Sequence, residues 1–480
     1  MSQELKPGVA QSHNDLQLPD QGRIVGEIYD EIRQVYKSDD RPWVIGYSGG
    51  KDSTTALQLI WHALAGLPKE DLSKPVYVIS SDTLVETPVV IDVIDSTLAS
   101  VERNAKGSGL PFTTAKVKPK IRDSFWVNLI GRGYPAPSKT FRWCTERLKI
   151  TPADTFILEK VSEYGEVVLI LGVRKGESNT RDQVISLHKI KNTLLSRHSK
   201  FAQTYVYTPV VDFTVDDIWM YLLSVDSPWG GDNQELAELY RASNAGECPL
   251  VVDDTTPSCG SSRFGCWTCT VIGKDKTMES LVGTGEKWLE PLLTYRNLLA
   301  ETQVIENKHI YRDFKRRTGQ VTLKTDKTNI SRGPYRLEYR EELLERLLRT
   351  QCEVRELSGD KSITLIYPEE LHEIRRLWRL EMGDWIDRVP RIFRKVMGHD
   401  LPWVKDDGAV FDYLDYEVLE RICLKHDLPT QLVVKLIDQE RQTQGMVTRG
   451  RIFKNLSRVL HEEWRSEEEV MDILKDTFEV

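Results

Sequence analysis

The stretch Ser48–Ser53 reads SGGKDS and decides how the first part of the chain should fold. It follows a short apolar run, Trp43–Tyr47, and precedes a segment with helical periodicity that begins at Thr54. Glycines between a strand and a helix let backbone N–H groups turn toward an anion, and the first helical turn adds unpaired donors. Lys51 adds a full positive charge. The pattern predicts a phosphate-binding loop.

Apolar runs and helical segments alternate on either side of this loop. Strands are predicted at Pro75–Ile79, Phe112–Val117 and Glu166–Val173, and helices at Thr54–Leu64 and Pro88–Val101. This alternation indicates a doubly wound, mostly parallel α/β sheet that holds its ligand at the carboxyl ends of the strands. The expected ligand edge comprises Ser48–Ser53, Ser80–Glu86 and Gly172–Glu177.

Length and composition limit the classes of protein. A chain of 480 residues, 40% hydrophobic and 29% charged, is typical of a globular protein with two or three domains. The polar segment Met1–Asp20 has no apolar core of the signal-peptide kind, and no run is long enough to span a membrane, so a cytoplasmic location without membrane contact is expected. A net charge of -8 excludes a uniformly basic nucleic-acid-binding protein, although not a local basic patch.

The cysteines form the second informative pattern. Four of the seven cluster within Cys248–Cys269, ending in the CWTC sequence of Cys266–Cys269, and thiolates alone suit zinc or an iron–sulfur cluster. A zinc ribbon usually has two C-x-x-C pairs, and this segment has one. We therefore divide the chain into a polar tail (1–25), a loop domain (26–226), a Cys-rich segment (227–285) and a helical C-terminal region (286–480).

Longer motifs carry a family resemblance. SGGKDS resembles the PP-loop of the ATP pyrophosphatases, which cleave ATP between the α and β phosphates. Phosphoadenylyl-sulfate reductases share four further blocks with this chain: SSDTLVETP (Ser80–Pro88) resembles their DTG…PET stretch, and the others are RWCTERLKI (Arg142–Ile150), LGVRKGESNTR (Leu171–Arg181) and TPVVDFTVDDIWMYL (Thr208–Leu222). Nearly the whole chain is similar to the DndC-type sulfurtransferases of bacterial DNA phosphorothioation.

This resemblance implies an adenine nucleotide α hydrolase-like fold and an ATP-dependent sulfurtransferase. A DNA phosphate oxygen would attack the α-phosphorus of ATP, release pyrophosphate, and be displaced with AMP by sulfur. ATP, Mg²⁺ and a cluster, of the 4Fe–4S type, are the implied cofactors. DNA, a cysteine desulfurase as sulfur donor and further phosphorothioation subunits are the implied partners.

The resemblance also implies the site residues. The catalytic residues would be Lys51, Asp52 and Cys144. The nucleotide would contact Ser48, Gly49, Gly50, Lys51, Asp52, Ser53, Ser81, Asp82, Thr83, Gly172, Arg174, Glu177 and Arg181, with Asp52 and Asp82 near Mg²⁺. Four of the five residues Cys144, Cys248, Cys259, Cys266 and Cys269 would bind the cluster.

Departures from the family pattern leave alternatives open. Thr145 follows Cys144 where cluster-containing reductases have a second cysteine, and the reductases' nucleophilic cysteine near the C-terminus is missing, which disfavours a sulfate-assimilation reductase. A transfer-RNA thiolase, a reductase-like PP-loop enzyme and a nucleotide-gated scaffold of a DNA-modification complex remain alternatives. One of Cys144, Cys248 and Cys259 could relay sulfur, and Arg142 and Arg147 beside Cys144 would favour its thiolate.

A basic stretch in the helical region is the predicted DNA contact. Its cations are interleaved with aromatic residues, a combination that holds nucleic-acid strands without reading bases. The stretch comprises Lys308, Arg312, Lys315, Arg316, Arg317, Lys324, Lys327, Arg332, Arg336 and Arg340, with Tyr311, Phe314, Tyr335 and Tyr339. Arg132 and Lys139 around a glycine- and proline-rich turn are a second candidate.

Overall fold

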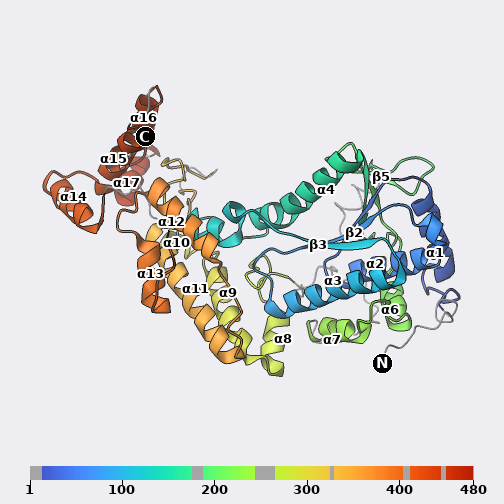
Figure 1. The fold of residues 1–480 in the computed structure, drawn as a ribbon. Helices are drawn as coiled ribbons and strands as arrows, with labels where there is room; N and C mark the ends of the chain where they lie inside the picture. The colour runs from blue at the N-terminus through green and yellow to red at the C-terminus, as the bar shows by residue number, and fades with distance from the viewer. Residues whose placement is uncertain are drawn as a thin grey trace. The chain divides into compact units, whose positions relative to one another are not determined.

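The computed structural model describes residues 13–175, 187–243, 265–324, 329–403, 411–444 and 450–478. The chain divides into two compact units. The first unit runs to Pro119 and resumes at Trp143–Leu289; the second consists of Lys120–Arg142 and the chain from Glu290 onward (Figure 1). Within the described ranges, no helix combines the length and apolar character that a membrane crossing needs.

A six-stranded sheet forms the centre of the first unit. Its order is β3-β2-β1-β4-β6-β5, and all neighbours are parallel except β5 and β6. The strands are β1 (Trp43–Gly46), β2 (Val76–Ser81), β3 (Phe112–Val117), β4 (Val167–Leu171), β5 (Ser196–Arg197) and β6 (Thr204–Tyr207). The predicted doubly wound, mostly parallel fold is confirmed.

Alternating strand residues bury both faces of the sheet. Trp43 and Ile45 pack with one apolar cluster, whereas Val44 between them packs with another, which contains Ile157 of α4. Figure 1 shows α4 on the opposite side of the sheet from α2 and α3. The first unit's helical segments are α1 (Val25–Lys37), α2 (Lys51–Ala65), η1 (Lys69–Asp71), α3 (Pro88–Ser108), η4 (Thr145–Ile150), α4 (Thr151–Tyr164), α6 (Val215–Ser224), α7 (Asn233–Ser243), α8 (Lys276–Thr284) and η5 (Lys287–Leu289).

Strand register places three loops at one edge. Gly46 at the end of β1 is paired with Ile79 of β2 and with Leu171 of β4. The segments that follow these strands therefore leave the sheet side by side, as expected for the ligand edge of a parallel sheet.

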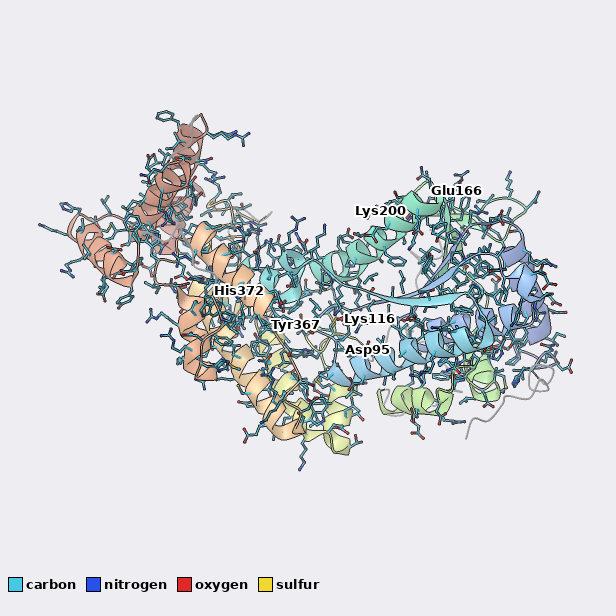
Figure 2. The ribbon with its side chains drawn as sticks, in the orientation of Figure 1. Asp95, Lys116, Glu166, Lys200, Tyr367 and His372 are labelled. Carbon is cyan, nitrogen blue, oxygen red and sulfur yellow. The ribbon has the colours of Figure 1, made fainter. Side chains whose placement is uncertain are left out.

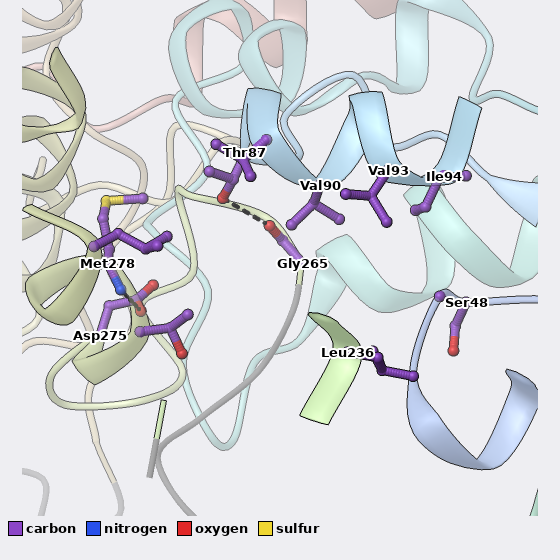
Figure 3. Close-up of a pocket in the computed structure, with 13 residues that line it drawn as sticks. Ser48, Thr87, Val90, Val93, Ile94, Leu236, Gly265, Asp275 and Met278 are labelled. Carbon is purple, nitrogen blue, oxygen red and sulfur yellow. Dashed lines mark hydrogen bonds between the residues drawn. The ribbon is translucent and has the colours of Figure 1, made fainter. Parts of the chain in front are cut away.

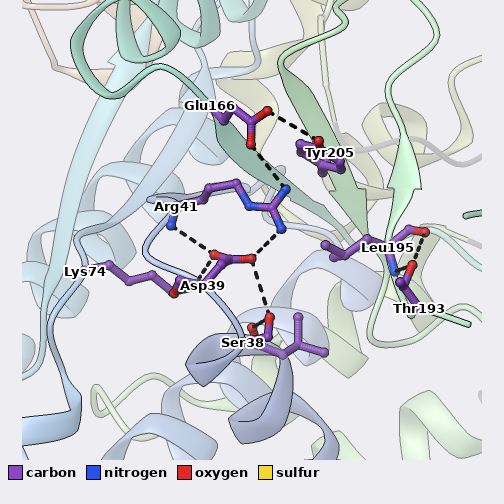
Figure 4. A network of polar contacts seen from close by, with 9 residues as sticks. Ser38, Asp39, Arg41, Lys74, Glu166, Thr193, Leu195 and Tyr205 are labelled. Atoms are coloured by element: carbon purple, nitrogen blue, oxygen red, sulfur yellow. Dashed lines mark hydrogen bonds and ion pairs between the residues drawn. The ribbon is translucent and has the colours of Figure 1, made fainter.

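A polar network ties together the opposite, amino-terminal ends of the strands (Figure 4). Asp39 accepts hydrogen bonds from the Arg41 backbone N–H at 2.9 Å and from Lys74 Nζ at 3.0 Å. The Arg41 guanidinium also approaches Glu166 at 3.6 Å and lies 4.0 Å from the centre of the Tyr205 ring. Burial opposes ionisation of Asp39, but Arg41 and Lys74 outweigh it and lower the pKa of this carboxyl. The network links the chain segments at the amino-terminal edge of the sheet, opposite the predicted ligand edge.

The second unit is almost entirely helical, as predicted for the C-terminal region. Lys120–Arg142, which sequence boundaries assign to the loop domain, packs here instead. Trp126 Nε1 donates to the Leu365 carbonyl at 2.6 Å, and Trp378 Nε1 donates to the Ile130 carbonyl at 3.1 Å. The helical segments are η2 (Ile121–Asp123), η3 (Val127–Gly131), α9 (Glu290–Glu301), α10 (Lys308–Tyr311), α11 (Leu337–Ser358), α12 (Pro368–Met382), α13 (Arg388–Met397), α14 (Tyr413–Lys425), α15 (Thr430–Thr443), α16 (Ile452–Leu460) and α17 (Glu467–Phe478).

Candidate active site

The predicted loop joins β1 to α2. Gly49 has φ +73°, in the left-handed region, and a Cβ there would lie 3.3 Å from Cγ1 of Ile94. Gly50 caps α2 in an extended conformation, so the helix begins at Lys51, three residues earlier than predicted. Lys51 and Asp52 therefore lie in the first helical turn, where backbone N–H groups have no partner within the helix.

Hydroxyl groups hold the shape of the loop. Ser53 Oγ donates to the Gly50 carbonyl at 2.9 Å and accepts from the Ser48 N–H at 3.2 Å. The two serine hydroxyls are also 3.1 Å apart. Thr54 Oγ1 donates to the same Gly50 carbonyl at 3.0 Å. The serines of SGGKDS thus have a structural role that the motif alone does not reveal.

A chain of charged groups crosses the loop. Asp52 Oδ2 accepts from Lys51 Nζ at 2.9 Å, and Asp52 Oδ1 accepts from Arg174 Nε at 2.5 Å. Arg174, just beyond β4, is only 5% exposed, so its guanidinium is positioned inside the site. The three predicted residues Lys51, Asp52 and Arg174 are brought together. Both Asp52 oxygens are already bound by cations.

Gly172 is required where β4 ends against α2. A Cβ at this position would lie 2.6 Å from the Asp52 carbonyl oxygen and 2.7 Å from the Ser53 nitrogen. Both neighbours are backbone atoms that cannot rotate away. Gly172, predicted as a nucleotide contact, therefore has a packing reason for being glycine.

Tyr240 of α7 contributes to the loop and was missed by sequence reasoning. Its hydroxyl accepts the Lys51 backbone N–H at 3.2 Å, and Lys51 Nζ lies 5.4 Å from the ring centre. The hydroxyl oxygen thus uses a loop amide of the kind that binds phosphate oxygens. Tyr240 lies 189 residues from the motif, in an ordinary amphipathic helix, so no local signal identifies it.

The segment after β2 supplies Asp82, whose carboxylate is held by lysines. It approaches Lys118 Nζ at 3.0 Å and Lys116 Nζ at 3.4 Å, and Lys116 also pairs with Asp95 at 2.7 Å (Figure 2). Burial opposes ionisation, but the Leu84 N–H and these lysines outweigh it and lower the pKa of Asp82. Both Asp52 oxygens have cationic partners, whereas in Asp82 the lysines bind Oδ2 and the Leu84 N–H donates to Oδ1 at 3.0 Å. A divalent ion would have to compete with these partners for either carboxylate.

The same turn contains a strained residue. Leu84 has φ +65°, although it is not glycine, and it stands where the DTG motif has glycine. Glu86 closes the turn by accepting the Thr83 N–H at 2.7 Å. Burial raises the pKa of Glu86. The turn therefore carries a buried carboxyl beside the predicted nucleotide residue Thr83, while Ser81 ends the strand before it.

Three predicted thiols gather beside this turn. Cys266 pairs with Glu86 in a short β-bridge, its Sγ is 3.3 Å from Thr83 Oγ1, and the Cys269 N–H donates to its carbonyl at 3.1 Å. Cys144 comes from the start of the π-helical turn η4. Lys149 is the cation near all three sulfurs. Its pKa is raised most by the negative charge of Cys266, and further by that of Glu86, Cys144 and Cys269.

The protonation of these thiols differs from the sequence expectation. Burial raises the pKa of Cys266 to about 12. Burial and then the nearby Cys269 also raise the pKa of Cys144, so the expectation that Arg142 and Arg147 favour its thiolate is wrong in this arrangement. Lys149 opposes the rise but does not overcome desolvation. The cation that faces the thiols lies five residues beyond Cys144.

The donor chemistry fits an iron–sulfur cluster, although the spacing is not that of a formed metal site. Thiols from two separate segments meet at one lysine. Among the described residues, no three Cys, His, Asp or Glu side chains lie at metal-binding distances. The predicted ligands Cys248 and Cys259, and the predicted nucleotide contacts Glu177 and Arg181, lie outside the described residues.

A small apolar pocket joins the loop to the thiol segment (Figure 3). Ser48 and Gly49 line it on the loop side, and Gly265, directly before Cys266, lines it on the other. Thr87 fixes Gly265 through two hydrogen bonds to its carbonyl, each 3.2 Å long. The apolar walls come from α3, α7 and α8: Val89, Val90, Val93, Ile94, Leu236, Met278 and Leu281.

Comparison with known proteins agrees with these motifs. Residues 42–272 match the phosphoadenosine phosphosulfate reductase domain family. The matched range includes the loop, the Thr83 turn and all three described thiols of the site, and it also contains Lys120–Arg142 of the second unit.

More distant similarities extend further along the chain. An uncharacterized protein of Methanocaldococcus jannaschii is 25% identical over 267 residues, which are 55% of this chain and 44% of that protein, so the chain matches less than half of its relative. A phosphoadenylyl-sulfate reductase of Candida auris aligns at 14% identity and a TM-score of 0.28, covering 48% of this chain and 92% of that one. The U34-tRNA thiolase NcsA of Methanococcus maripaludis, with its [4Fe-4S] cluster, aligns at 13% identity and a TM-score of 0.28, covering 61% and 87%.

Proposed function

We propose that the protein is an ATP-dependent sulfurtransferase that adenylates a DNA backbone phosphate and supports its conversion to a phosphorothioate. A phosphate oxygen attacks the α-phosphorus of ATP, pyrophosphate leaves, and the activated phosphorus then carries AMP as a leaving group. A sulfur nucleophile forms the new phosphorus–sulfur bond as the bond to AMP breaks. The displaced oxygen leaves with AMP. A cysteine desulfurase would supply the sulfur, and further subunits of the phosphorothioation system would act with the protein on DNA.

The loop residues have defined tasks in the first step. The amides of the Gly50–Asp52 turn bind phosphate oxygens, and Lys51 compensates charge on the leaving pyrophosphate. Arg174 offers a guanidinium fork to a second phosphate group. Because Asp52 holds both cations in the described arrangement, nucleotide phosphates would take over as their partners. Before the nucleotide binds, Asp52 keeps Lys51 and Arg174 beside the loop.

The thiols would serve the sulfur side of the reaction. Cys144, Cys266 and Cys269 would hold the cluster together with Cys248 or Cys259. Such a cluster supplies a site at which sulfur can be held and electrons exchanged. Lys149 compensates the negative charge of bound thiolates, and buried Glu86 limits how far that compensation extends.

The observation that supports this proposal most strongly is that the predicted nucleotide loop and the thiol segment lie close together. One pocket is lined both by Ser48 and Gly49 of the nucleotide loop and by Gly265 beside Cys266. Thr83, in the turn after β2, contacts the sulfur of Cys266 directly. An activated phosphate held by the loop would therefore lie close to a sulfur source.

Mass spectrometry of digested nucleic acids tests the proposal. DNA from cells with the gene should contain phosphorothioate dinucleotides, and DNA from cells with the Asp52→Ala variant should lack them. Transfer RNA from the same cells is digested in parallel. Loss of a thionucleoside from transfer RNA with no phosphorothioate in DNA would replace this function by that of a transfer-RNA thiolase.

A further inference from the structure

The second unit contains a large polar cleft. Its volume is about 1450 Å³, and its walls come mainly from the segment Asp313–Gln320 and from α11, α12, α15 and α16. Ten arginine and lysine side chains line it, against six aspartates and glutamates. The cleft is therefore a concentration of positive charge in a chain whose net charge is -8.

Four of the six acidic groups in the cleft make ion pairs, one of them Asp438 with Arg441 at 3.7 Å. Glu462 pairs with Lys435 at 2.5 Å, and Glu381 pairs with Arg317 at 3.4 Å. Glu467 forms a two-pronged pair with Arg332, a residue outside the lining. These pairs fix the walls without cancelling the remaining cations.

Arg336, Arg376 and Arg388 in the lining also make ion pairs with carboxylates. The other five lining cations make no ion pair with a carboxylate of the described residues, and four of them are held by neutral groups. Arg316 donates to the Arg332 carbonyl at 3.1 Å, Arg132 to Asn128 Oδ1 at 3.2 Å, and Lys315 to the Glu463 carbonyl at 3.0 Å. Exposed Arg458 on α16 makes no ion pair with any carboxylate of the described residues. Neutral acceptors orient these side chains but leave their charge uncompensated.

A buried arginine adds to this positive field. Arg340 is 2% exposed and donates to the carbonyls of Tyr335 at 2.7 Å and Gly131 at 3.2 Å. Gly133 leaves the space for it, since a Cβ there would lie 2.5 Å from the guanidinium carbon. Burial lowers the pKa of Arg340 to about 10, which keeps it charged at neutral pH.

We propose that this cleft binds the phosphodiester backbone of a nucleic acid. Guanidinium groups match phosphate oxygens in geometry as well as in charge. Aromatic rings lie beside them: Lys315 Nζ is 5.1 Å from the centre of the Trp464 ring, and Phe314 and Tyr416 also line the cleft. Rings next to cations favour a nucleic acid over an acidic peptide. That the nucleic acid is DNA rests on the proposed function; backbone binding itself does not.

The cleft accounts for part of the basic stretch that the sequence singles out. Lys315, Arg316, Arg317, Arg336 and Arg340 line it, as does Arg132 from the second candidate turn. Arg312 does not line it: its guanidinium donates to the backbone carbonyls of Gly333 and Arg332 instead.

Fluorescence anisotropy on the full chain tests the cleft. The probes are short labelled duplex DNA, single-stranded DNA and RNA, without ATP. We expect Arg316→Glu with Arg458→Glu to weaken duplex binding by at least about 10-fold, and to reduce the slope of log K against log salt by about 0.9 per lost phosphate contact. The matched control is Lys361→Glu, an exposed charge reversal in the same unit outside the cleft. An unchanged thermal unfolding transition and an unchanged far-ultraviolet circular dichroism spectrum establish that the double variant is folded.

Each outcome decides between the two proposals. Equal weakening by Lys361→Glu, undiminished binding in the double variant, absence of nucleic-acid binding by the wild type, or equally tight binding of polyglutamate would overturn the cleft assignment. Binding of RNA alone would keep the cleft and overturn DNA as the substrate. Cleft-dependent DNA binding without phosphorothioate in cellular DNA would likewise keep the cleft and overturn the proposed function.

Discussion

Replacement of Gly172 by alanine should impair the nucleotide loop without replacing any charged side chain. The added Cβ would lie 2.6 Å from the Asp52 carbonyl oxygen, so the two backbones must separate by about 0.8 Å to reach the 3.4 Å of ordinary contact. A displacement of about 1 Å in a catalytic site costs on the order of 100-fold in rate. Scaled to this displacement, we expect a roughly 40-fold loss, or about 2 kcal/mol of transition-state stabilisation.

The assay follows conversion of ATP to AMP and pyrophosphate together with thermal unfolding. Overpacking of the strand against α2 should also lower the free energy of unfolding by about 1–3 kcal/mol. Gly107→Ala is the matched control, because Gly107 is an exposed residue of α3 and a Cβ there would meet no atom within 4 Å outside its own stretch of helix. It should keep full activity and gain slightly in stability. A Gly172→Ala enzyme with wild-type rate and stability would refute the close-packing argument.

Three further perturbations address the loop, the thiols and the helical unit. Lys51→Ala should raise the activation free energy for release of AMP and pyrophosphate by about 2–4 kcal/mol. Release of ADP and phosphate by the wild type would contradict the pyrophosphatase assignment. Cys266→Ser should lose iron after anaerobic preparation, whereas Cys352→Ser on α11 should keep it; equal iron in both would exclude Cys266 as a ligand. Burial raises the pKa of Glu370 to about 7, above its usual 4.5, so the folded state binds the extra proton and stability should fall as the pH rises from 4.5 to 7. Glu370→Gln should flatten this dependence in calorimetry, and an unchanged profile would show that another group causes it.

Periodicity and the glycine loop were enough to predict the sheet. β3 has the predicted bounds, Phe112–Val117, and β4 lies centrally as its continuous apolar run indicates. Helix α2 starts earlier than predicted, because Lys51 and Asp52 interrupt the apolar pattern while still having helical backbone. Apolar periodicity locates the packed part of a helix, whereas its polar first turn is set by the cap.

Residues of the site were predictable only where a motif surrounds them. Lys51, Asp52 and Arg174 were found because they belong to recognisable blocks. Tyr240 and Lys149 join the site only because the fold brings them to it: Tyr240 reaches the loop, and Lys149 reaches the thiols. The residues next to them in sequence do not form a phosphate-binding or thiol motif. The inclusion of Lys120–Arg142 in the helical unit depends on two buried tryptophans that recognise backbone carbonyls more than two hundred residues away.

The contact between Tyr240 and the loop should allow nucleotide binding to be followed by tryptophan fluorescence. The Tyr240 ring lies edge-on to the buried indole of Trp219, with ring centres 5.2 Å apart. A nucleotide phosphate that takes the Lys51 amide must displace the tyrosine hydroxyl, and the ring then shifts against the indole. ATP binding should therefore alter the emission of Trp219, seen as the difference between wild type and Trp219→Phe, and identical responses in both would show that the tyrosine stays in place. Through this one side chain, the protein contains its own optical sensor of the nucleotide.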